Sequence, residues 1–429
     1  MSSKKYDIIL FGVTGFTGKL AAEYLLHKTR DLGKTLSWAV SARNAAKAES
    51  VLQELVVGSQ DTTSSSTVLP DILVADLECP TPEDRTKLQE IVQQTKVVLT
   101  CSGPFEKYGP TLVELCAQFG VYYADITGES DYFRQMIEKY DRQAQETGAA
   151  IVFHCGHDCI PCDLLVWEMN HYASQQGYEL KQVLTYQEFS EEFAFSGGTA
   201  ATAAYQLSKD RTSNAAAKPS FDPLMTAKTG EESKFRTKNI CPKKDVEVPM
   251  LPGRIAGPWI MAPVMMNCVR RSNALLGYSS ELAYGDSSVK AQSWTTWTKN
   301  MAMTVAIGVA IHAPVLSGLV SSLIPKTGEG PSREEMERGF LKLHATATMV
   351  EKTTTTTESS QKNLQGLFHF QKDTGYLYTA ALLCETGFLL VEKYGTLEGG
   401  CVTPATALGG ALTERILKEL DATLEIKEV

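Results

Sequence analysis

The sequence predicts an α/β protein whose N-terminal part is a Rossmann domain, built on a doubly wound parallel sheet. Three observations predict this fold. Residues 8–11 are an uninterrupted apolar run, which is typical of a strand buried on both faces. A glycine-rich turn and a helical pattern follow this run directly. Up to about residue 155, six strand patterns alternate with five helical patterns, as in a complete Rossmann domain.

The first turn carries three glycines at three-residue spacing, and residues 19–26 after it have helical periodicity. A strand, a glycine turn and a helix N-terminus together bind a dinucleotide pyrophosphate, because glycines allow close approach and the helix offers free N–H groups. The usual spacing is Gly-x-Gly-x-x-Gly, so an ordinary turn is the alternative. The predicted cofactor-binding residues here are Gly12, Thr14, Gly15, Phe16, Thr17 and Gly18.

The end of the second strand, residues 36–42, indicates which dinucleotide is preferred. NAD-preferring sites usually place an acidic residue there, which accepts hydrogen bonds from the ribose 2′-hydroxyl. Arg43 stands at this point instead, and no Asp or Glu follows before Glu49. A cation suits the 2′-phosphate of NADP. We therefore predict NADP(H) rather than NAD(H), with a surface arginine as the alternative interpretation of Arg43.

Two later strand ends complete the predicted cofactor site. Asp76 closes the third strand, residues 71–76, where we expect an adenine contact. The fourth strand, residues 97–100, leads into a turn of mostly small residues that we expect beside the ribose and nicotinamide, because ligands lie outside the carboxyl ends of the strands. The residues of this turn are Cys101, Ser102, Gly103 and Pro104.

The remaining elements of the domain follow in order. Thr81 and Pro82 are typical of a helix start, as cap and first helical residue. The other predicted helices span residues 45–55, 109–119 and 131–147, and the other predicted strands span residues 121–125 and 149–153.

Composition excludes several classes of function. A length of 429 residues suits two domains, or one large domain with an insertion. The net charge of −9 and the lack of a Lys/Arg block argue against nucleic-acid binding. Ten cysteines in a chain of this length are not a disulfide framework. Residues 1–5 lead straight into the first strand, so we expect no signal peptide and an intracellular protein.

A cluster of thiols and imidazoles follows the sixth strand. Cys155, Cys159 and Cys162 have the spacing C-x₃-C-x₂-C, with His154 directly before the first cysteine and His157 between the first two. This pattern invites a metal or iron–sulfur hypothesis. Small thiols that pack a crowded turn before a helix are the favoured alternative, and we predict no metal site.

The predicted second domain contains fewer motifs. Ser196-Gly197-Gly198-Thr199 opens a helix to residue 207, whose N-terminus either holds a polar or anionic group or is simply capped. Residues 211–248 are polar and predict a surface segment. The other predicted elements are a strand at 180–189, a hairpin of 344–350 with 364–370 around a tip at 353–360, and helices at 376–391 and 411–420.

Residues 300–325 contain no charged side chain. This length could cross a bilayer, but Ala, Gly and Ser are frequent, and His312 and Pro314 interrupt it. A buried helix pair and a lipid-surface element are the two main hypotheses, and a full membrane span is the least favoured.

Several motifs occur together along the chain. They are Phe11-Gly12-x-x-Gly15-Phe16-Thr17-Gly18, Ala42-Arg43, Gly103-Pro104-Phe105-x-x-Tyr108-Gly109, Asp125-x-Thr127-Gly128-Glu129, Cys155-Gly156-x-Asp158-x-Ile160-Pro161-x-Asp163, Ser196-Gly197-Gly198-Thr199 and Thr403-Pro404.

In this combination the chain resembles the saccharopine dehydrogenase-like oxidoreductases, in particular the eukaryotic members and the bacterial trans-acting enoyl reductases of polyketide-derived lipids. The resemblance implies an NADP-binding Rossmann domain (residues 1–155), a second α/β domain with a mixed sheet (156–395) and a C-terminal segment that returns to the first domain (396–429). The family is associated with membranes and lipid droplets, which favours lipid contact by residues 300–325. The chain departs from the family at Cys159 and Cys162, where serines are expected, and at an insertion around residues 353–360.

The leading functional hypothesis is an NADPH-dependent reductase of a hydrophobic, enoyl-type substrate in lipid or glycolipid metabolism. A homodimer is a separate hypothesis about how the protein assembles. Conjugate reduction leaves an enolate-like anion that needs a proton. The candidate donors are Tyr108, His154 and Asp158, and ordinary packing or hydrogen bonding is the alternative for each. A non-catalytic lipid-droplet or membrane protein is the second hypothesis. A saccharopine-type amino-acid dehydrogenase is the third, although the second domain offers only the pair Arg270-Arg271 to clamp carboxylates.

Overall fold

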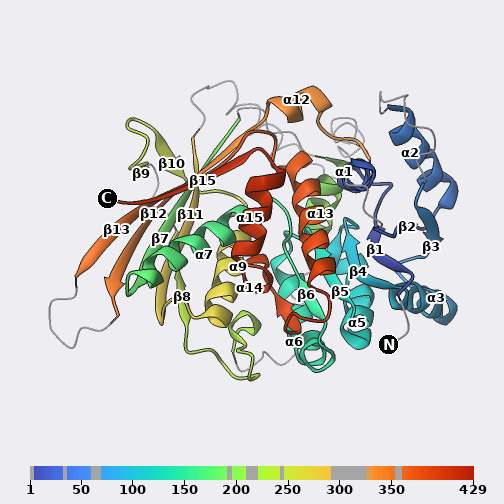
Figure 1. The fold of residues 1–429 in the computed structure, drawn as a ribbon, viewed down its shortest axis with the longest axis horizontal. Helices are drawn as coiled ribbons and strands as arrows, with labels where there is room; N and C mark the ends of the chain where they lie inside the picture. Colours follow the sequence, from blue (N-terminus) through green and yellow to red (C-terminus); the bar gives the residue numbers. More distant parts are fainter. Residues whose placement is uncertain are drawn as a thin grey trace.

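The computed structural model describes residues 4–31, 36–58, 69–190, 196–208, 221–241, 246–290, 326, 328–352 and 360–429 (Figure 1). Two sheets lie side by side in this part of the chain, with helices between and around them. The uncharged stretch 300–325 lies outside the described residues, as does nearly all of the predicted hairpin tip 353–360.

The first sheet has seven strands within the described residues, in the order β14-β6-β5-β4-β1-β2-β3. Every pairing in it is parallel. The order of the first six strands confirms the predicted Rossmann fold. The strands are β1 (Tyr6–Phe11), β2 (Trp38–Ala42), β3 (Asp71–Val74), β4 (Thr95–Thr100), β5 (Tyr122–Asp125), β6 (Ala150–Val152) and β14 (Gly400–Val402).

Alternate side chains of β1 enter two different cores. Ile8 and Leu10 pack toward one face of the sheet, and Ile9 and Phe11 pack toward the other. A strand buried on both faces needs helices on both sides, which explains its continuous apolar run. The helices of this half are α1 (Phe16–Asp31), α2 (Ala45–Gly58), α3 (Pro82–Gln93), α4 (Phe105–Tyr108), α5 (Pro110–Phe119) and α6 (Ser130–Thr147).

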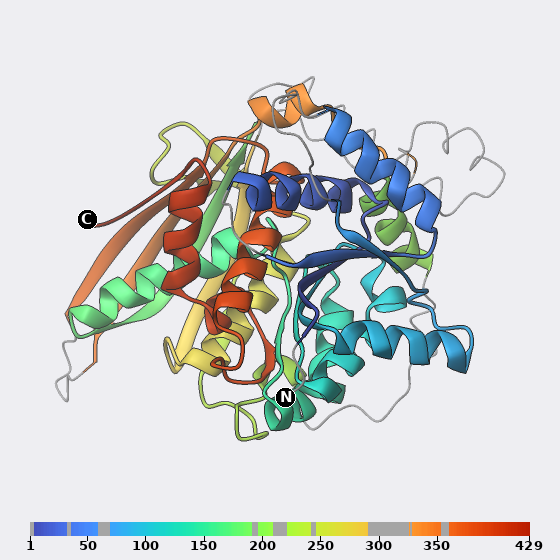
Figure 2. The same cartoon turned by 45° about the vertical axis from the view of Figure 1, so that its right-hand side comes forward.

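Helix α13 (Leu377–Glu392) comes from late in the sequence but covers the first sheet. It packs beside α1 and against β4 and β5, as Figures 1 and 2 show. Gly387 allows the close approach, because a Cβ there would lie 2.8 Å from the Leu99 side chain. The helix therefore completes the face of the sheet on which α1 and α2 lie.

The second sheet has eight strands within the described residues and is mixed, because β7 and β11 pair in parallel while β12 and β13 form an antiparallel hairpin. Its main path is β15-β13-β12-β7-β11-β10-β9, and β8 also pairs with β11. The strands are β7 (Tyr178–Phe189), β8 (Arg236–Asn239), β9 (Val246–Glu247), β10 (Ile255–Gly257), β11 (Glu281–Val289), β12 (Leu341–Glu351), β13 (Gln361–Phe370) and β15 (Ala422–Glu428).

Helices α7, α9 and α15 pack on the second sheet. Their buried side chains belong to the same continuous core that reaches α13 and one face of β1. The two sheets are therefore joined by shared apolar packing. The helices of this half are α7 (Ile160–Gln175), α8 (Gly197–Ser208), the short 3₁₀ helix η1 (Pro223–Met225), α9 (Ala262–Leu276), α12 (Arg333–Arg338), α14 (Pro404–Ala407) and α15 (Gly410–Glu419).

The C-terminal segment contributes to both sheets. β14 lies parallel to β6, so the chain returns to the first domain as the resemblance implies. After α15 it returns again, and β15 pairs with β13 at the edge of the second sheet. The boundaries at residues 155 and 395 stay a prediction.

Some strands of the second sheet lack a clear pattern in the sequence. β8 lies within the predicted surface segment 211–248, and most of its side chains are exposed, so no apolar alternation marks it. β11 buries Asp286 and Ser287, which breaks its hydrophobic pattern. Backbone pairing with neighbouring strands forms both of these strands.

Candidate functional site

A cavity of about 750 Å³ lies at the carboxyl edge of the first sheet. Most of the predicted cofactor residues line it, which places them around one space as a doubly wound sheet requires. These residues are Gly12, Thr14, Gly15, Phe16, Thr17, Arg43, Asp76, Cys101, Ser102 and Gly103. Gly18 and Pro104 are not among the lining residues.

The glycines of the first turn are required by close contacts. Gly12 has φ +91°, and a Cβ there would lie 2.8 Å from Ser102 Oγ. A Cβ on Gly18 would lie 2.0 Å from the carbonyl oxygen of Gly12, so Gly18 lets α1 pack onto the turn. A Cβ on Gly15 would have only the Gly12 carbonyl oxygen close to it, at 3.3 Å. The turn is therefore a tight cradle with open space beside Gly15, which fits a dinucleotide pyrophosphate.

Arg43 lies at the β2 end of the cavity, where the adenosine ribose of a dinucleotide is expected. Its side chain is 62% exposed, and its ion pair with Glu78 is long, at 4.0 Å. Glu78 lies closer to Lys107, at 2.9 Å. Exposed pairs of this kind contribute little, so the guanidinium is available to a phosphate.

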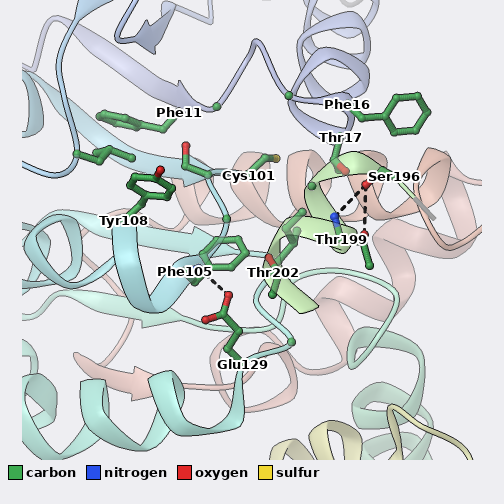
Figure 3. A pocket seen from close by; sticks show the side chains of 18 of the residues that line it. Phe11, Phe16, Thr17, Cys101, Phe105, Tyr108, Glu129, Ser196, Thr199 and Thr202 are labelled. Atoms are coloured by element: carbon green, nitrogen blue, oxygen red, sulfur yellow. Dashed lines mark hydrogen bonds between the residues drawn. The ribbon is translucent and has the colours of Figure 1, made fainter. Parts of the chain in front are cut away.

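Tyr108 also lies at this end. Its ring centroid is 5.9 Å from the guanidinium carbon of Arg43 and 4.9 Å from Lys107 Nζ. Figure 3 shows Tyr108 on the opposite side of the pocket from Ser196 and Thr199. Of the three predicted proton donors, Tyr108 is therefore placed beside the adenosine end.

The turn after β4 passes along the middle of the cavity. The N–H of Cys101 donates to the Phe11 carbonyl oxygen at 3.0 Å, which ties this turn to the glycine cradle. Burial raises the pKa of the Cys101 thiol to about 12, so the thiol stays protonated near neutral pH. Beyond it, the backbone N–H groups of Phe105 and Glu106 donate to the Glu129 carboxylate at 2.6 and 3.0 Å.

Helix α8 forms the facing wall and follows the predicted Rossmann domain in the sequence. Figure 2 shows α8, in light green, on the side of the molecule that carries the first sheet. Ser196 caps it by accepting the Thr199 N–H at 3.2 Å, and the Gly197 N–H donates to the Glu329 carbonyl oxygen at 3.0 Å. Its N-terminus is thus both capped and at the cavity. The α8 residues that line the cavity are Gly198, Thr199, Thr202, Ala203 and Gln206.

Sequence reasoning singled out Ser196 to Thr199 but missed Thr202, Ala203 and Gln206. Positions three, four and seven residues after Thr199 lie on the same helix face, so helical spacing could have indicated them. It also missed Met261 and Gly328, which line the cavity from distant parts of the sequence without a motif.

Asp158 and Met261 meet at another part of the wall. A Cβ on Gly128 would lie 3.0 Å from Met261 Cε and 3.3 Å from Asp158 Oδ2. Desolvation raises the pKa of Asp158 to about 6. This carboxyl group therefore holds a proton more readily than an exposed aspartate would, at a point where a bound molecule can reach it.

His154 does not line the cavity. Its ring is buried, and Nδ1 lies 2.6 Å from the Thr127 carbonyl oxygen. Burial lowers the pKa of His154 to about 4, so the imidazole is neutral near neutral pH. The backbone of His154 has a φ of +64°. Its backbone N–H donates to Asp125 Oδ1 at 3.1 Å, and this bond joins the loops that follow β5 and β6. The structure places His154 as part of this junction.

The thiols of Cys155, Cys159 and Cys162 are buried in the turn and at the start of α7. In the part of the chain that the structure describes, no three His, Cys, Asp or Glu side chains are grouped closely enough to hold a metal ion. A search of the same residues finds no helix with the length and apolar character needed to cross a membrane.

Comparison with known proteins agrees with this geometry. Residues 8–152 match the family model of the saccharopine dehydrogenase NADP-binding domain. A Mycobacterium tuberculosis protein named provisionally as a trans-acting enoyl reductase is 33% identical over 443 residues, covering 96% of each chain. A trans-acting enoyl reductase of Mycobacterium bovis is 32% identical over 432 residues, covering 97% of this chain and 96% of its own.

Among solved structures, saccharopine dehydrogenase (L-Glu forming) of Saccharomyces cerevisiae superposes with a TM-score of 0.58 at 11% identity, over 99% of this chain and 100% of that chain. At that identity the likeness concerns the fold, and it includes both sheets. The glycine cradle, the cavity and the full-length relatives agree, and the chain belongs to the saccharopine dehydrogenase-like oxidoreductases as an NADP-dependent member related to the trans-acting enoyl reductases.

Proposed function

We propose that the protein is an NADPH-dependent reductase of a hydrophobic, enoyl-type acyl substrate. The observation that carries the proposal is one cavity that joins the glycine cradle and Arg43 to a second wall with Asp158 and Met261. Phe16, Phe105 and Met261 give that cavity an apolar lining. Relatives that align over nearly the whole chain are named enoyl reductases, which supports the same chemistry.

The cofactor would lie along the carboxyl edge of the first sheet. Gly12 and Gly15 would approach its pyrophosphate, Arg43 its 2′-phosphate, and Cys101 to Gly103 its nicotinamide-side ribose. Tyr108 would pack beside the adenine, next to Arg43. When bound, NADPH supplies a hydride. The protein's part is to orient the acceptor carbon toward the nicotinamide and to exclude water.

Asp158 is our candidate for the proton donor. Reduction of a conjugated double bond leaves negative charge on the substrate, which a nearby acid must neutralise. Asp158 lines the cavity, and desolvation raises its pKa to about 6, close to the range in which an acid both holds and releases a proton. Tyr108 lies at the adenosine end and His154 lies outside the cavity wall, so neither position favours proton transfer to the substrate.

An amino-acid substrate of the saccharopine type is less well supported. Among the described residues that line the cavity, Arg43 is the only Lys, Arg or His, and the acids Glu129, Asp131 and Asp158 stand toward the other wall. Arg270 pairs with Asp222 at 2.8 Å. Arg271 is fully buried against the Cys401 carbonyl oxygen and Asp141. Neither arginine is available to clamp a substrate carboxylate, so a neutral ester or thioester suits the cavity better.

The test is turnover of NADPH with a panel of enoyl thioesters of increasing chain length. The wild-type protein should oxidise NADPH with at least one of them. Gly15→Val should abolish this, because the new side chain would fill the open space beside the cradle. Asp158→Asn should lower kcat strongly, whereas Asp131→Asn, an exposed aspartate on the same cavity, should change it little. NADPH binding without any turnover would instead support the non-catalytic hypothesis.

We further propose an intracellular protein that contacts a lipid-droplet or membrane surface through residues 300–325, in lipid or glycolipid metabolism. The absence of charge in that stretch supports this, as does the family resemblance. Deletion of 300–325 should move the protein from the lipid fraction to the aqueous fraction while it still binds NADPH. A homodimer is a separate proposal, tested by the mass of the protein in solution.

A further inference from the structure

The carboxylate of Glu129 lies where three segments of the chain meet. It accepts the N–H of Phe105 at 2.6 Å and the N–H of Glu106 at 3.0 Å, both at the start of α4. It also accepts the side-chain amide of Gln206, on α8, at 2.9 Å. Figure 3 shows Glu129 pointing toward the backbone at Phe105, below Thr202. One carboxylate therefore bonds the turn after β4 to the helix that forms the opposite wall.

The same two segments touch directly at Gly103. A Cβ on Gly103 would lie 3.1 Å from Thr202 Oγ1, one helical turn before Gln206. Residues 101–103 are those that we expect beside the nicotinamide-side ribose. The position of α8 thus bears on the part of the cavity where the nicotinamide would lie, and not on the Arg43 end.

Glu129 is only 3% exposed, and a buried carboxylate is stable only when it is hydrogen-bonded. Desolvation raises its pKa to about 7, and the bonds from Phe105 and Gln206 act in the opposite direction. The Gln206 amide supplies one of three donors to this charge, so its loss should loosen the turn while leaving the backbone donors in place.

We propose that Glu129 and Gln206 form a positioning pair that holds the nicotinamide end of the cofactor in register with the substrate. The inference rests on the proposed cofactor orientation and gives Glu129 and Gln206 a role in it. Gln206 lies beyond the predicted Rossmann domain (residues 1–155), so the pair makes placement of the reacting ring depend on docking of α8. Arg43 and the glycine cradle hold the other end independently.

Two ligands separate the ends of the site. NADPH occupies both, whereas 2′-phospho-ADP carries the 2′-phosphate, adenine and diphosphate but neither the nicotinamide-side ribose nor the nicotinamide. Gln206→Leu should weaken NADPH binding about 10- to 100-fold, the effect of one hydrogen bond to a charged group, and leave binding of 2′-phospho-ADP unchanged. Gln206→Lys should restore NADPH affinity, because an ammonium can donate to Glu129 in place of the amide.

The matched control is Gln135→Leu. Gln135 donates to Glu106 Oε1 at 3.5 Å and lies near the same turn, and it is not among the described donors to the Glu129 carboxylate. It should bind both ligands as the wild type does. Equal weakening of both ligands by Gln206→Leu, or no weakening of either, would overturn the positioning pair. Failure of wild-type protein to bind either ligand would overturn the proposed cofactor site itself, and binding without turnover would leave the pair intact but remove the reductase.

Discussion

The guanidinium carbon of Arg43 lies 5.9 Å from the centroid of the Tyr108 ring. The two residues are 65 positions apart in the chain: Arg43 directly follows β2, and Tyr108 is the last residue of α4, the short helix after β4. Because β2 receives the adenosine half of a dinucleotide in this fold, the contact assigns Tyr108 to that half. It also leaves Arg43 exposed at the mouth of the cavity, with one long ion pair.

Replacement of Arg43 by Ala should weaken NADPH binding roughly 10- to 100-fold, because a hydrogen bond between charged groups contributes about 1.5–3 kcal/mol. Binding of NADH should change much less, since NADH lacks the 2′-phosphate. Fluorescence titration of both nucleotides measures this ratio. Lys107→Ala, which removes the neighbouring cation, is the control, and equal losses for NADPH and NADH in Arg43→Ala would contradict the assignment.

Tyr108→Phe should keep kcat within about twofold of wild type, because the ring and not the hydroxyl faces Arg43. Tyr108→Ala should raise the Kd for NADPH, since the adenine side of the cavity loses a packing surface. Steady-state kinetics with an enoyl thioester would detect either change. A loss of kcat in Tyr108→Phe of a hundredfold or more would restore Tyr108 as the proton donor.

The pH dependence of turnover should report Asp158. A proton donor must be protonated before the step, and burial raises the pKa of Asp158 to about 6. We therefore expect kcat to fall as the pH rises through about 6. In Asp158→Asn the residual rate should lose this dependence. A wild-type kcat that stays constant from about pH 5 to about pH 8 would exclude a carboxyl donor of this pKa.

Asp286→Asn should change how stability depends on pH. Burial raises the pKa of Asp286 to about 7, so the folded state binds its proton more tightly than the unfolded state does. Its contribution to the free energy of unfolding is therefore present below about pH 4 and is lost as the pH rises to about 7. Buried His154 and His157, whose pKa values are lowered to about 4, act in the opposite direction.

Urea unfolding of wild type and Asp286→Asn at several pH values isolates this contribution, because the histidines are common to both proteins. The wild type should lose stability relative to the variant between about pH 4 and 7. Thr185 and Gln187 hydrogen-bond to Asp286 and can rearrange around an amide. A difference between the two proteins that does not vary with pH would show that the carboxyl group does not titrate in this window.

Tyr376→Phe should destabilise the protein by about 1–2 kcal/mol, the usual cost of removing one buried hydrogen-bond partner. The Tyr376 hydroxyl accepts the Ser196 N–H at 2.6 Å, and its ring packs edge-on against Phe16 at 5.3 Å. The variant keeps the ring contact, so the cradle should stay formed. Thermal unfolding and NADPH titration would measure both effects, and an unchanged Tm would show that α8 does not depend on this bond.

A site residue could be predicted from the sequence when the residues that it acts with lie close to it in the chain. Gly12, Gly15 and Gly18 could be interpreted because one strand, one turn and one helix suffice to give them a role. Arg43 could be assigned because it follows a predicted strand. Glu129 was noticed only as part of a motif, and its partner Gln206 lies 77 residues later. Nothing in the local pattern of either residue indicates the other.

The sequence by itself determined the parallel nucleotide-binding sheet, the phosphate cradle and the family, because these depend on apolar periodicity and glycine spacing within short segments. Only the tertiary structure decided that α13 covers the first sheet, that β14 and β15 join different sheets, and that Tyr108 and His154 stand away from the second wall of the cavity. Those outcomes depend on contacts between residues far apart in the chain. Such contacts form because they bury apolar side chains and pair backbone groups across the whole fold. The pattern of a single segment does not specify its distant partner.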